Sequence, residues 1–220
     1  MLAELAARLG AHDAQPTRPV LRVAVDGVDG AGKTTFAGEL AASLRSLGRE
    51  VIRASVDGFH NPRAVRYRLG RDSPQGFYRD SYDYAGLRQA LLDPLGPDSS
   101  LRYRKAIFDV DADQSVSQPP LTAQPGSILI MDGLFLHRPE LRGVWDDSIF
   151  LRVDFAVSVP RGAARGPGFG SPDPAAQSNR RYIGGNELYF READPEKWAG
   201  VVVDNNDLNA PFIVSDASGS

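Results

Sequence analysis

The chain has 220 residues, of which 42% are hydrophobic and 24% are charged, so it can bury a core without a metal or disulfide. It has no cysteine, which excludes a disulfide scaffold, a thiol nucleophile and a cysteine-ligated metal site. The net charge of −3 disfavours nucleic-acid binding, for which a basic excess is expected. No apolar run reaches the roughly 18 residues of a membrane span, so we expect a cytoplasmic protein without membrane contact.

Helix-like and strand-like patterns alternate along the chain. A helix is expected within residues 1–12, further helices are predicted at 33–47 and 84–92, and Asn61-Pro62 marks another helix start. Short apolar runs predict strands at 21–26, 50–56, 127–131, 149–153 and, as the last one, 201–203, while residues 101–109 alternate like a hairpin strand. This order predicts an α/β fold, a parallel sheet with helices on both faces.

The domain organisation is expected to be simple, with one domain over residues 1–214. Gly, Pro and Ser are frequent in 162–176, but a strand is predicted beyond this stretch. We therefore interpret it as part of a lid region at about 157–192 and not as a linker. The polar residues 215–220 predict a disordered tail.

One segment carries a strong chemical signal. It reads Gly-Val-Asp-Gly-Ala-Gly-Lys-Thr from Gly27 to Thr34 and matches the phosphate-binding pattern G-x-x-x-x-G-K-[ST] between a predicted strand and a predicted helix. Its glycines let backbone N–H groups turn towards phosphate oxygens. The motif predicts a three-layer P-loop NTPase fold with Lys33 on the β- and γ-phosphates of ATP and Thr34 on Mg²⁺. The predicted nucleotide-binding residues are Gly27, Val28, Asp29, Gly30, Ala31, Gly32, Lys33, Thr34 and Thr35.

The remaining motifs favour a kinase over other P-loop enzymes. A GTPase needs an Asn-Lys-x-Asp element, and the nearest string, residues 204–207, lacks the lysine. Hydrolytic ATPases usually carry a Glu beside the metal-binding Asp, and here Gly133 follows Asp132. A kinase instead excludes water and orients an acceptor hydroxyl, for which it needs a lid and a separate base.

Two aspartates at predicted strand ends are candidates for that chemistry. Asp57 follows the second strand, beside the P-loop, where it could accept the proton of the acceptor and touch Mg²⁺ through water. Asp132 follows an apolar strand and is a candidate Mg²⁺ ligand. Both precede a glycine, so a simple turn aspartate is the alternative for each.

Several strings resemble the uridine kinase-like family of P-loop kinases, which includes uridine, pantothenate, nicotinamide riboside and phosphoribulose kinases. They occur in the family's order over roughly residues 20 to 213, at 25–35, 56–60, 108–109, 130–136 and 204–205. The resemblance implies an ATP-dependent transfer to an alcohol group of a small molecule, with Asp57 as the catalytic base and Asp132 at the magnesium site. It also implies a lid whose arginines neutralise the transferring phosphoryl group, here Arg161 and Arg165, with Arg180 and Arg181 as further candidates.

The acceptor is less well defined, because the chain departs from the family's pattern. Uridine kinases recognise the pyrimidine with a His where this chain has Asp113, and Gly166 follows Arg165 where the family has an Arg-Asp pair. A carboxylate only accepts hydrogen bonds, so we expect poor uridine phosphorylation and a donor-rich or anionic acceptor. A nucleoside, a sugar, a pantothenate-like compound and a phosphorylated compound all remain open.

Arginines at 63, 66, 68 and 71, with aromatic residues nearby, form either a solvated helix face or a pocket for an anionic acceptor. The predicted acceptor-binding residues are His60, Arg63, Tyr67, Phe108, Asp109 and Asp113. His137 is expected at the surface. A nucleotide-binding regulator without transfer activity and an RNA-binding module are the rival functions, and homo-oligomerisation is left open.

Overall fold

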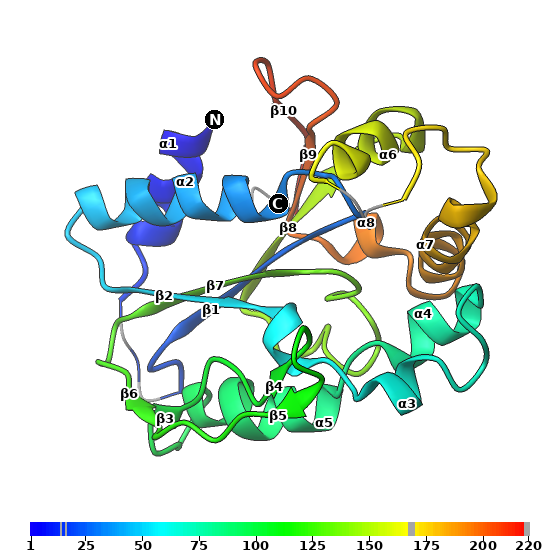
Figure 1. Ribbon diagram of the computed structural model, residues 1–220. Coiled ribbons are helices and arrows are strands. Elements are labelled where there is room, and N and C mark those ends of the chain that lie inside the picture. Colours follow the sequence, from blue (N-terminus) through cyan, green and yellow to red (C-terminus); the bar gives the residue numbers. More distant parts are fainter. Residues whose placement is uncertain (14, 16, 167–169, 218–220) are drawn as a thin grey trace.

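A six-stranded sheet forms the centre of the protein, in the strand order β10-β9-β8-β1-β7-β2 (Figure 1). This computed structural model describes residues 1–13, 15, 17–166 and 170–217. Neighbouring strands are parallel except for β10, which is antiparallel to β9. The strands are β1 (Leu21–Gly27), β2 (Val51–Ser55), β7 (Ile128–Gly133), β8 (Asp147–Arg152), β9 (Val201–Asp204) and β10 (Phe212–Asp216).

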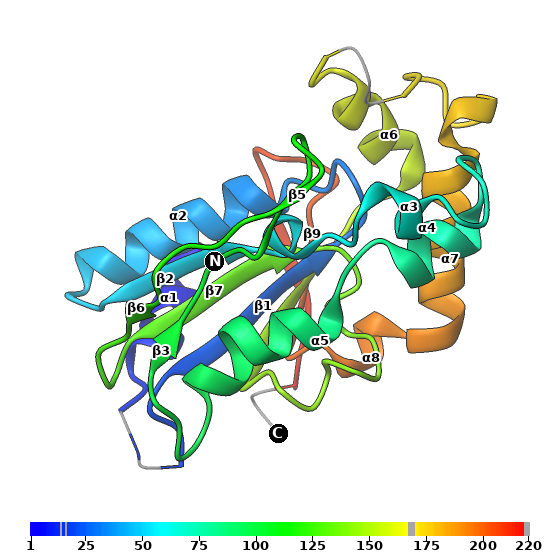
Figure 2. The same ribbon diagram turned by 60° about the horizontal axis from the view of Figure 1, so that its bottom comes forward.

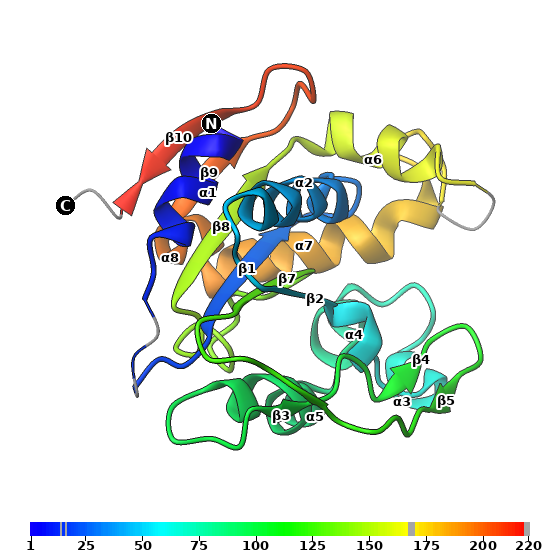
Figure 3. The same ribbon diagram turned by 90° about the vertical axis from the view of Figure 1, so that its left-hand side faces the viewer.

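Helices cover both faces of this sheet, which confirms the predicted α/β fold. α1 (Leu2–Gly10) and α2 (Lys33–Ser46) lie together over one face (Figure 3). On the other face, α5 (Tyr84–Leu87) crosses in front of β1 and β7 in Figure 2 and continues as a π-helical turn over Arg88–Leu92. The other helices are α3 (Arg63–Arg66), α4 (Pro74–Asp80), α6 (Phe155–Ala163), α7 (Arg180–Ala193) and α8 (Pro195–Trp198).

The sheet separates two hydrophobic cores because apolar side chains of its central strands point to both faces. Val23 and Ile130 face Leu40 of α2, whereas Ala24 and Met131 face Leu91 of the π-helical turn. All six side chains are fully buried. Continuous apolar runs of this kind are typical of parallel strands covered on both sides, which is why these strands could be predicted.

Shorter elements complete the chain. Single 3₁₀ turns lie at Val56–Phe59, Asp93–Leu95 and Gln177–Asn179. Two small antiparallel pairs consist of β3 (Arg102–Tyr103) with β6 (Leu121–Thr122), and β4 (Phe108–Asp109) with β5 (Gln114–Ser115). Within the described part of the chain, no helix has both the length and the apolar character that crossing a bilayer requires.

Three predictions about elements are wrong. The strand predicted over 101–109 is split between β3 and β4, which belong to different pairs. β9 is not the last strand, and the predicted tail is not disordered at Ser215 and Asp216, which belong to β10. β10 is mostly exposed and is held by backbone pairing to β9 and by the Arg8–Asp216 ion pair at 2.9 Å. The short apolar run at 212–214 is the sequence signal that could have revealed it. Residues 218–220 of that predicted tail lie outside the described residues.

Candidate active site

The P-loop joins the end of β1 to the start of α2. Gly30 and Gly32 have φ values of +73° and +87°, in the left-handed region that glycine adopts without strain. A Cβ at Gly30 would lie 2.1 Å from the carbonyl oxygen of Ser158 in α6, so the loop is closely covered there. Val28 and Ala31 are buried in the core beneath α2, so these predicted nucleotide-binding residues can contribute only backbone groups.

A buried carboxylate lies beside the first residues of α2. Thr34 Oγ1 donates to Asp132 Oδ2 at 2.8 Å, and Arg53 Nη2 lies 2.7 Å from Asp132 Oδ1. The register of the sheet creates this contact, because β7 pairs with both β1 and β2 and places Asp132 opposite Val25 and Ser55. Mg²⁺ takes hard oxygen ligands and usually only one or two carboxylates from a protein. The hydroxyl of Thr34 and the carboxylate of Asp132 fit that requirement.

Asp57 lies in the 3₁₀ turn that follows β2. The oxygen that caps this turn is Ser55 Oγ, which accepts from the Asp57 N–H at 3.3 Å, so the Asp57 carboxylate is not the capping group. Tyr82 donates its hydroxyl to Asp57 Oδ1 at 3.5 Å, and the ring of His60 hydrogen-bonds the Asp57 carbonyl at 2.9 Å. Burial lowers the pKa of His60, although Asp57 opposes this shift. The Asp57 carboxylate is therefore available to a ligand.

Lys33 is enclosed at the start of α2. Its ammonium donates to the Val28 carbonyl at 2.7 Å, and burial lowers the pKa of this lysine while nearby carboxylates, led by Asp29, oppose the shift. An ammonium held on a single carbonyl has donors left for an anion.

A cavity of about 790 Å³ brings these groups together. Its volume lies in the range of roughly 300 to 1,000 Å³ that is usual for small-molecule sites. Predicted site residues that line it are Asp29, Gly30, Gly32, Lys33, Thr34, Thr35, Asp57, His60, Tyr67, Asp132, Arg161, Arg165 and Arg181. In the described part of the chain, no three His, Asp or Glu side chains gather into a metal-binding cluster, so the protein oxygens at Thr34 and Asp132 would need phosphate and water to complete a Mg²⁺ shell.

Comparison with known proteins supports the predicted P-loop fold. No family description matches the sequence, and no curated protein matches it. Among solved structures, a possible uridine kinase from Bacillus stearothermophilus is 22% identical, with a TM-score of 0.72 over 91% of this chain and 96% of its own. The chain has the fold of P-loop kinases.

Two further kinases with this fold are more distant in sequence. D-glycerate 3-kinase from Cryptococcus neoformans is 15% identical, with a TM-score of 0.59 over 96% of both chains. Phosphoribulokinase from Rhodobacter spheroides is 14% identical, with a TM-score of 0.60 over 86% of this chain and 71% of its own. The names of the three kinases indicate three different acceptors, so the P-loop kinase fold does not determine the acceptor.

The predicted lid arginines differ in what they contact. Arg161 donates to the carbonyls of Asn205, at 2.9 Å, and Asn206, and thereby ties α6 to the loop after β9. Arg165 lines the cavity, whereas Arg180 lies on a separate hollow between α4 and α7. Part of the predicted lid, residues 167–169, is outside the described residues.

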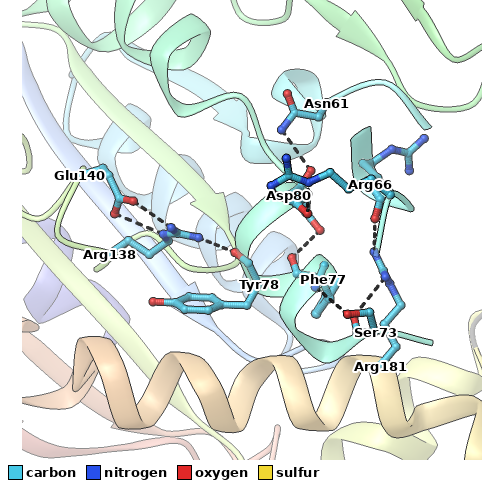
Figure 4. A network of polar contacts seen from close by, with 12 residues as sticks. Asn61, Arg66, Ser73, Phe77, Tyr78, Asp80, Arg138, Glu140 and Arg181 are labelled. Carbon is cyan, nitrogen blue, oxygen red and sulfur yellow. Dashed lines mark hydrogen bonds and ion pairs between the residues drawn. The ribbon is translucent and has the colours of Figure 1, made fainter. Parts of the chain in front are cut away.

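Arg181 holds the acceptor side of the cavity together. Figure 4 shows it reaching from α7 to the carbonyls of Arg66, at 3.1 Å, and Ser73, at 3.2 Å. A second arginine in the same view, Arg138, pairs with Glu140 at 2.8 Å and donates to the Tyr78 carbonyl. Because Arg181 is engaged by backbone carbonyls, we assign it a structural role in place of the predicted phosphate contact.

Four predicted acceptor residues do not line the cavity, so the structure does not bring them to the other site residues: Arg63, Phe108, Asp109 and Asp113. Asp113 has a left-handed φ of +52°, and its Oδ1 accepts from the Arg63 N–H at 2.8 Å and from Arg66 Nη2 at 3.2 Å. The Arg63 N–H lowers the pKa of Asp113. Asp109 accepts from the N–H groups of the hairpin turn instead. The hairpin residues that reach the cavity are Val110 and Asp111, which the sequence analysis missed.

The arginine-rich stretch is mostly occupied by partners within the protein. Arg68 pairs with the buried Asp80 at 2.8 Å, and Arg71 lies 5.2 Å from the Tyr67 ring centre. Of the four arginines in this stretch, Arg66 lines the cavity. The structure therefore reduces the predicted anionic pocket to one arginine, which is itself paired with Asp113.

A buried polar network behind the P-loop was missed as well. His137 is 1% exposed, so its expected surface position is wrong. Its Nδ1 lies 2.7 Å from Asp26 Oδ2 and its Nε2 lies 2.9 Å from Ser148 Oγ, while Tyr189 of α7 also donates to Asp26. Asp26 directly precedes Gly27, and an aspartate inside an otherwise apolar strand is the sequence signal that could have revealed this network.

Proposed function

We propose that the protein is an ATP-dependent kinase that transfers the γ-phosphate of ATP to a hydroxyl group of a small molecule, most simply a nucleoside. The observation that supports this proposal is that Lys33 and Asp57 line one cavity. One residue can bind the transferring phosphate and the other can deprotonate an acceptor. A cavity that held only nucleotide would not need a carboxylate such as that of Asp57.

Each residue has a defined task in this reaction. The acceptor oxygen attacks the γ-phosphorus, the bond from that phosphorus to the bridging oxygen breaks, and ADP leaves. The carboxylate of Asp57 takes the proton of the attacking hydroxyl. Lys33 binds the phosphates, and Arg165 stabilises the charge that develops on the transferring group. Thr34 and Asp132 would hold Mg²⁺, which neutralises phosphate charge when it is bound.

The alternatives to this proposal differ either in the acceptor or in whether phosphate is transferred at all. Kinases of this fold act on a sugar, a pantothenate-like compound or a phosphorylated compound as well as on nucleosides, and a regulator would bind nucleotide without transferring phosphate. The carboxylate of Asp57 favours transfer over regulation, because a regulator has no need of a base beside the phosphates.

ADP release with added alcohols tests the proposal. We expect Mg²⁺–ATP to be consumed steadily only when an acceptor such as cytidine, uridine, D-ribose or ribose 5-phosphate is present, and we expect uridine to be a poor acceptor. Folded Lys33→Ala protein is the matched control and should show almost no turnover. ADP release that ignores the alcohol would indicate an ATPase, and nucleotide binding without any release would indicate a regulator.

A further inference from the structure

The P-loop carries a carboxylate that phosphate binding does not explain. Of the three variable side chains between its glycines, Val28 and Ala31 point into the core and Asp29 lines the cavity. A carboxylate there repels the phosphates that the surrounding N–H groups and Lys33 attract. Asp29 therefore makes sense in this loop only if its oxygens meet a ligand group that donates hydrogen bonds.

Lys33 does not form an ion pair with the Asp29 carboxylate. Its ammonium donates to the Val28 carbonyl, and none of the described ion pairs includes Asp29. Burial raises the pKa of Asp29, and the positive charge of Lys33 opposes that rise. The side-chain partner of Asp29 comes instead from α7, at the acceptor end of the cavity.

That partner is Asn186. Its Nδ2 donates to Asp29 Oδ2 at 3.2 Å and to the Tyr182 carbonyl at 2.9 Å. Asn186 is 2% exposed, and its Oδ1 is enclosed without a hydrogen-bond partner among the described residues. Buried side-chain oxygens are nearly always paired, so an orphaned oxygen next to an enclosed carboxylate indicates that a donor is expected here.

The position of Asn186 is fixed by close packing. A Cβ on the preceding Gly185 would lie 2.5 Å from the Phe77 ring of α4, and one on Gly184 would lie 2.8 Å from Pro74, so α7 approaches α4 more closely than other residues would allow. One turn further on, Tyr189 donates to Asp26. A side chain held from both directions can present Asp29 in one orientation.

We propose that Asp29 binds a hydroxyl of the acceptor other than the one that is phosphorylated, and that Asn186 positions Asp29 for this contact. The acceptor is then a polyhydroxylated compound, a sugar, a polyol or a ribosyl compound, and not a simple alcohol. This inference rests on the proposed kinase function. Asp57 and Asp29 line the same cavity, so one hydroxyl meets the base while a second meets the P-loop carboxylate.

Pairs of acceptors that differ by one hydroxyl test the inference. The probes are cytidine with 2′-deoxycytidine and 3′-deoxycytidine, D-ribose with 2-deoxy-D-ribose, and glycerol with 1,3-propanediol. In the wild-type protein, we expect kcat/KM to fall about 10- to 100-fold for at least one analogue that lacks a hydroxyl. In Asp29→Ala, kcat/KM for the two members of that pair should differ by less than about threefold. The variant has no carboxylate to bind the extra hydroxyl, so losing that hydroxyl should cost the analogue little.

Further variants separate binding from folding. Asn186→Ala should reduce the same discrimination in part, with KM changing more than kcat. Glu187→Ala removes an equal charge from the exposed side of α7 and should keep the full discrimination. Asp29→Asn preserves the shape and an acceptor oxygen, so it should remain folded and keep part of the preference if the ligand group is a hydroxyl.

The outcomes distinguish this inference from the proposed function. Undiminished discrimination in folded Asp29→Ala would overturn the inference and leave the kinase proposal intact. If 2-amino-1,3-propanediol is preferred to glycerol and the preference vanishes in Asp29→Asn, the site binds an amine and the hydroxyl assignment is wrong.

A binding measurement covers the case in which no probe is phosphorylated. If the hydroxylated member of a pair raises the melting temperature of the wild type but not of Asp29→Ala, the hydroxyl site stands and the kinase proposal fails. If it raises neither, the inference is overturned too.

Discussion

The two ends of the cavity are built in different ways. At the phosphate end, residues 27–35 are contiguous in sequence, and Asp132 joins them through the register of adjacent parallel strands. At the acceptor end, Tyr67 follows a short helix, Asp111 lies in a hairpin and Asn186 belongs to a long helix. Their positions depend on contacts such as Arg181 with the Arg66 carbonyl, between residues far apart in the chain. The phosphate end follows from local sequence, whereas the acceptor end follows from tertiary packing.

Removal of the P-loop lysine should have the largest effect at the phosphate end. We expect Lys33→Ala to lower turnover by about 10²- to 10⁴-fold, because the transferring group loses a positive charge. The fold should persist, since Lys33 donates only to the neighbouring Val28 carbonyl. Circular dichroism and steady-state rates would check this, and near-normal turnover in folded protein would exclude the P-loop as the active site.

Asp57 stands where the two ends meet. Asp57→Asn keeps the shape of the side chain but cannot take a proton, so turnover should fall by about 10²- to 10⁴-fold while the Kd for Mg²⁺–ATP changes by less than about threefold. Single-turnover rates and calorimetry would measure the two quantities. An equal loss of nucleotide affinity would place Asp57 with the phosphate-binding residues.

Asp132 should behave differently from Asp57. In Asp132→Asn, we expect the Mg²⁺ concentration for half-maximal activity to rise by about tenfold or more, because the metal loses a charged ligand that Thr34 supports. Activity titrated with Mg²⁺ at saturating ATP would show the shift. If Asp132→Asn and Asp57→Asn gave the same kinetic pattern, the separation of base from metal ligand would be wrong.

The β4–β5 hairpin offers a matched pair at the acceptor end. Asp111→Ala should change the KM of the acceptor, since Asp111 lines the cavity. Asp113→Ala should leave KM and acceptor preference nearly unchanged, because that carboxylate turns away towards Arg63 and Arg66. Steady-state kinetics with the best acceptor would compare the two variants. A larger change in KM for Asp113→Ala than for Asp111→Ala would show that Asp113 contacts the acceptor after all.

The smallest expected effect is the uptake of a proton when ATP binds. Burial lowers the pKa of Lys33, and bound phosphate favours the charged ammonium and so raises that pKa again. At alkaline pH, between the two values, ATP binding should therefore take up as much as one proton, and affinity should weaken as the pH rises. Calorimetry in buffers of different ionisation enthalpy would measure the uptake, and an unchanged count in Lys33→Met would assign it to another group.

The same contrast explains which features the sequence could predict. The P-loop and the strands beneath it follow patterns within a few residues, and apolar runs such as 127–131 mark buried strands directly. Asp113 was assigned to the acceptor by its place in a string, but its left-handed backbone turns it away, and the string does not specify that turn. Asn186 has no motif around it. Its importance appears only once α7 packs on α4 and brings it to Asp29.

The carboxylate of Asp26 affects the order in which parts of the site can fold during synthesis. Its partners lie 111 and 163 positions later in the chain, at His137 and Tyr189. A chain still emerging from the ribosome therefore carries the complete P-loop long before the side chains that satisfy the carboxylate behind it have been synthesised. Until α7 has been synthesised and packs in place, the Asp26 carboxylate at the end of β1 must stay in contact with water and cannot be buried. The oldest part of the nascent site is thus completed by one of the youngest helices.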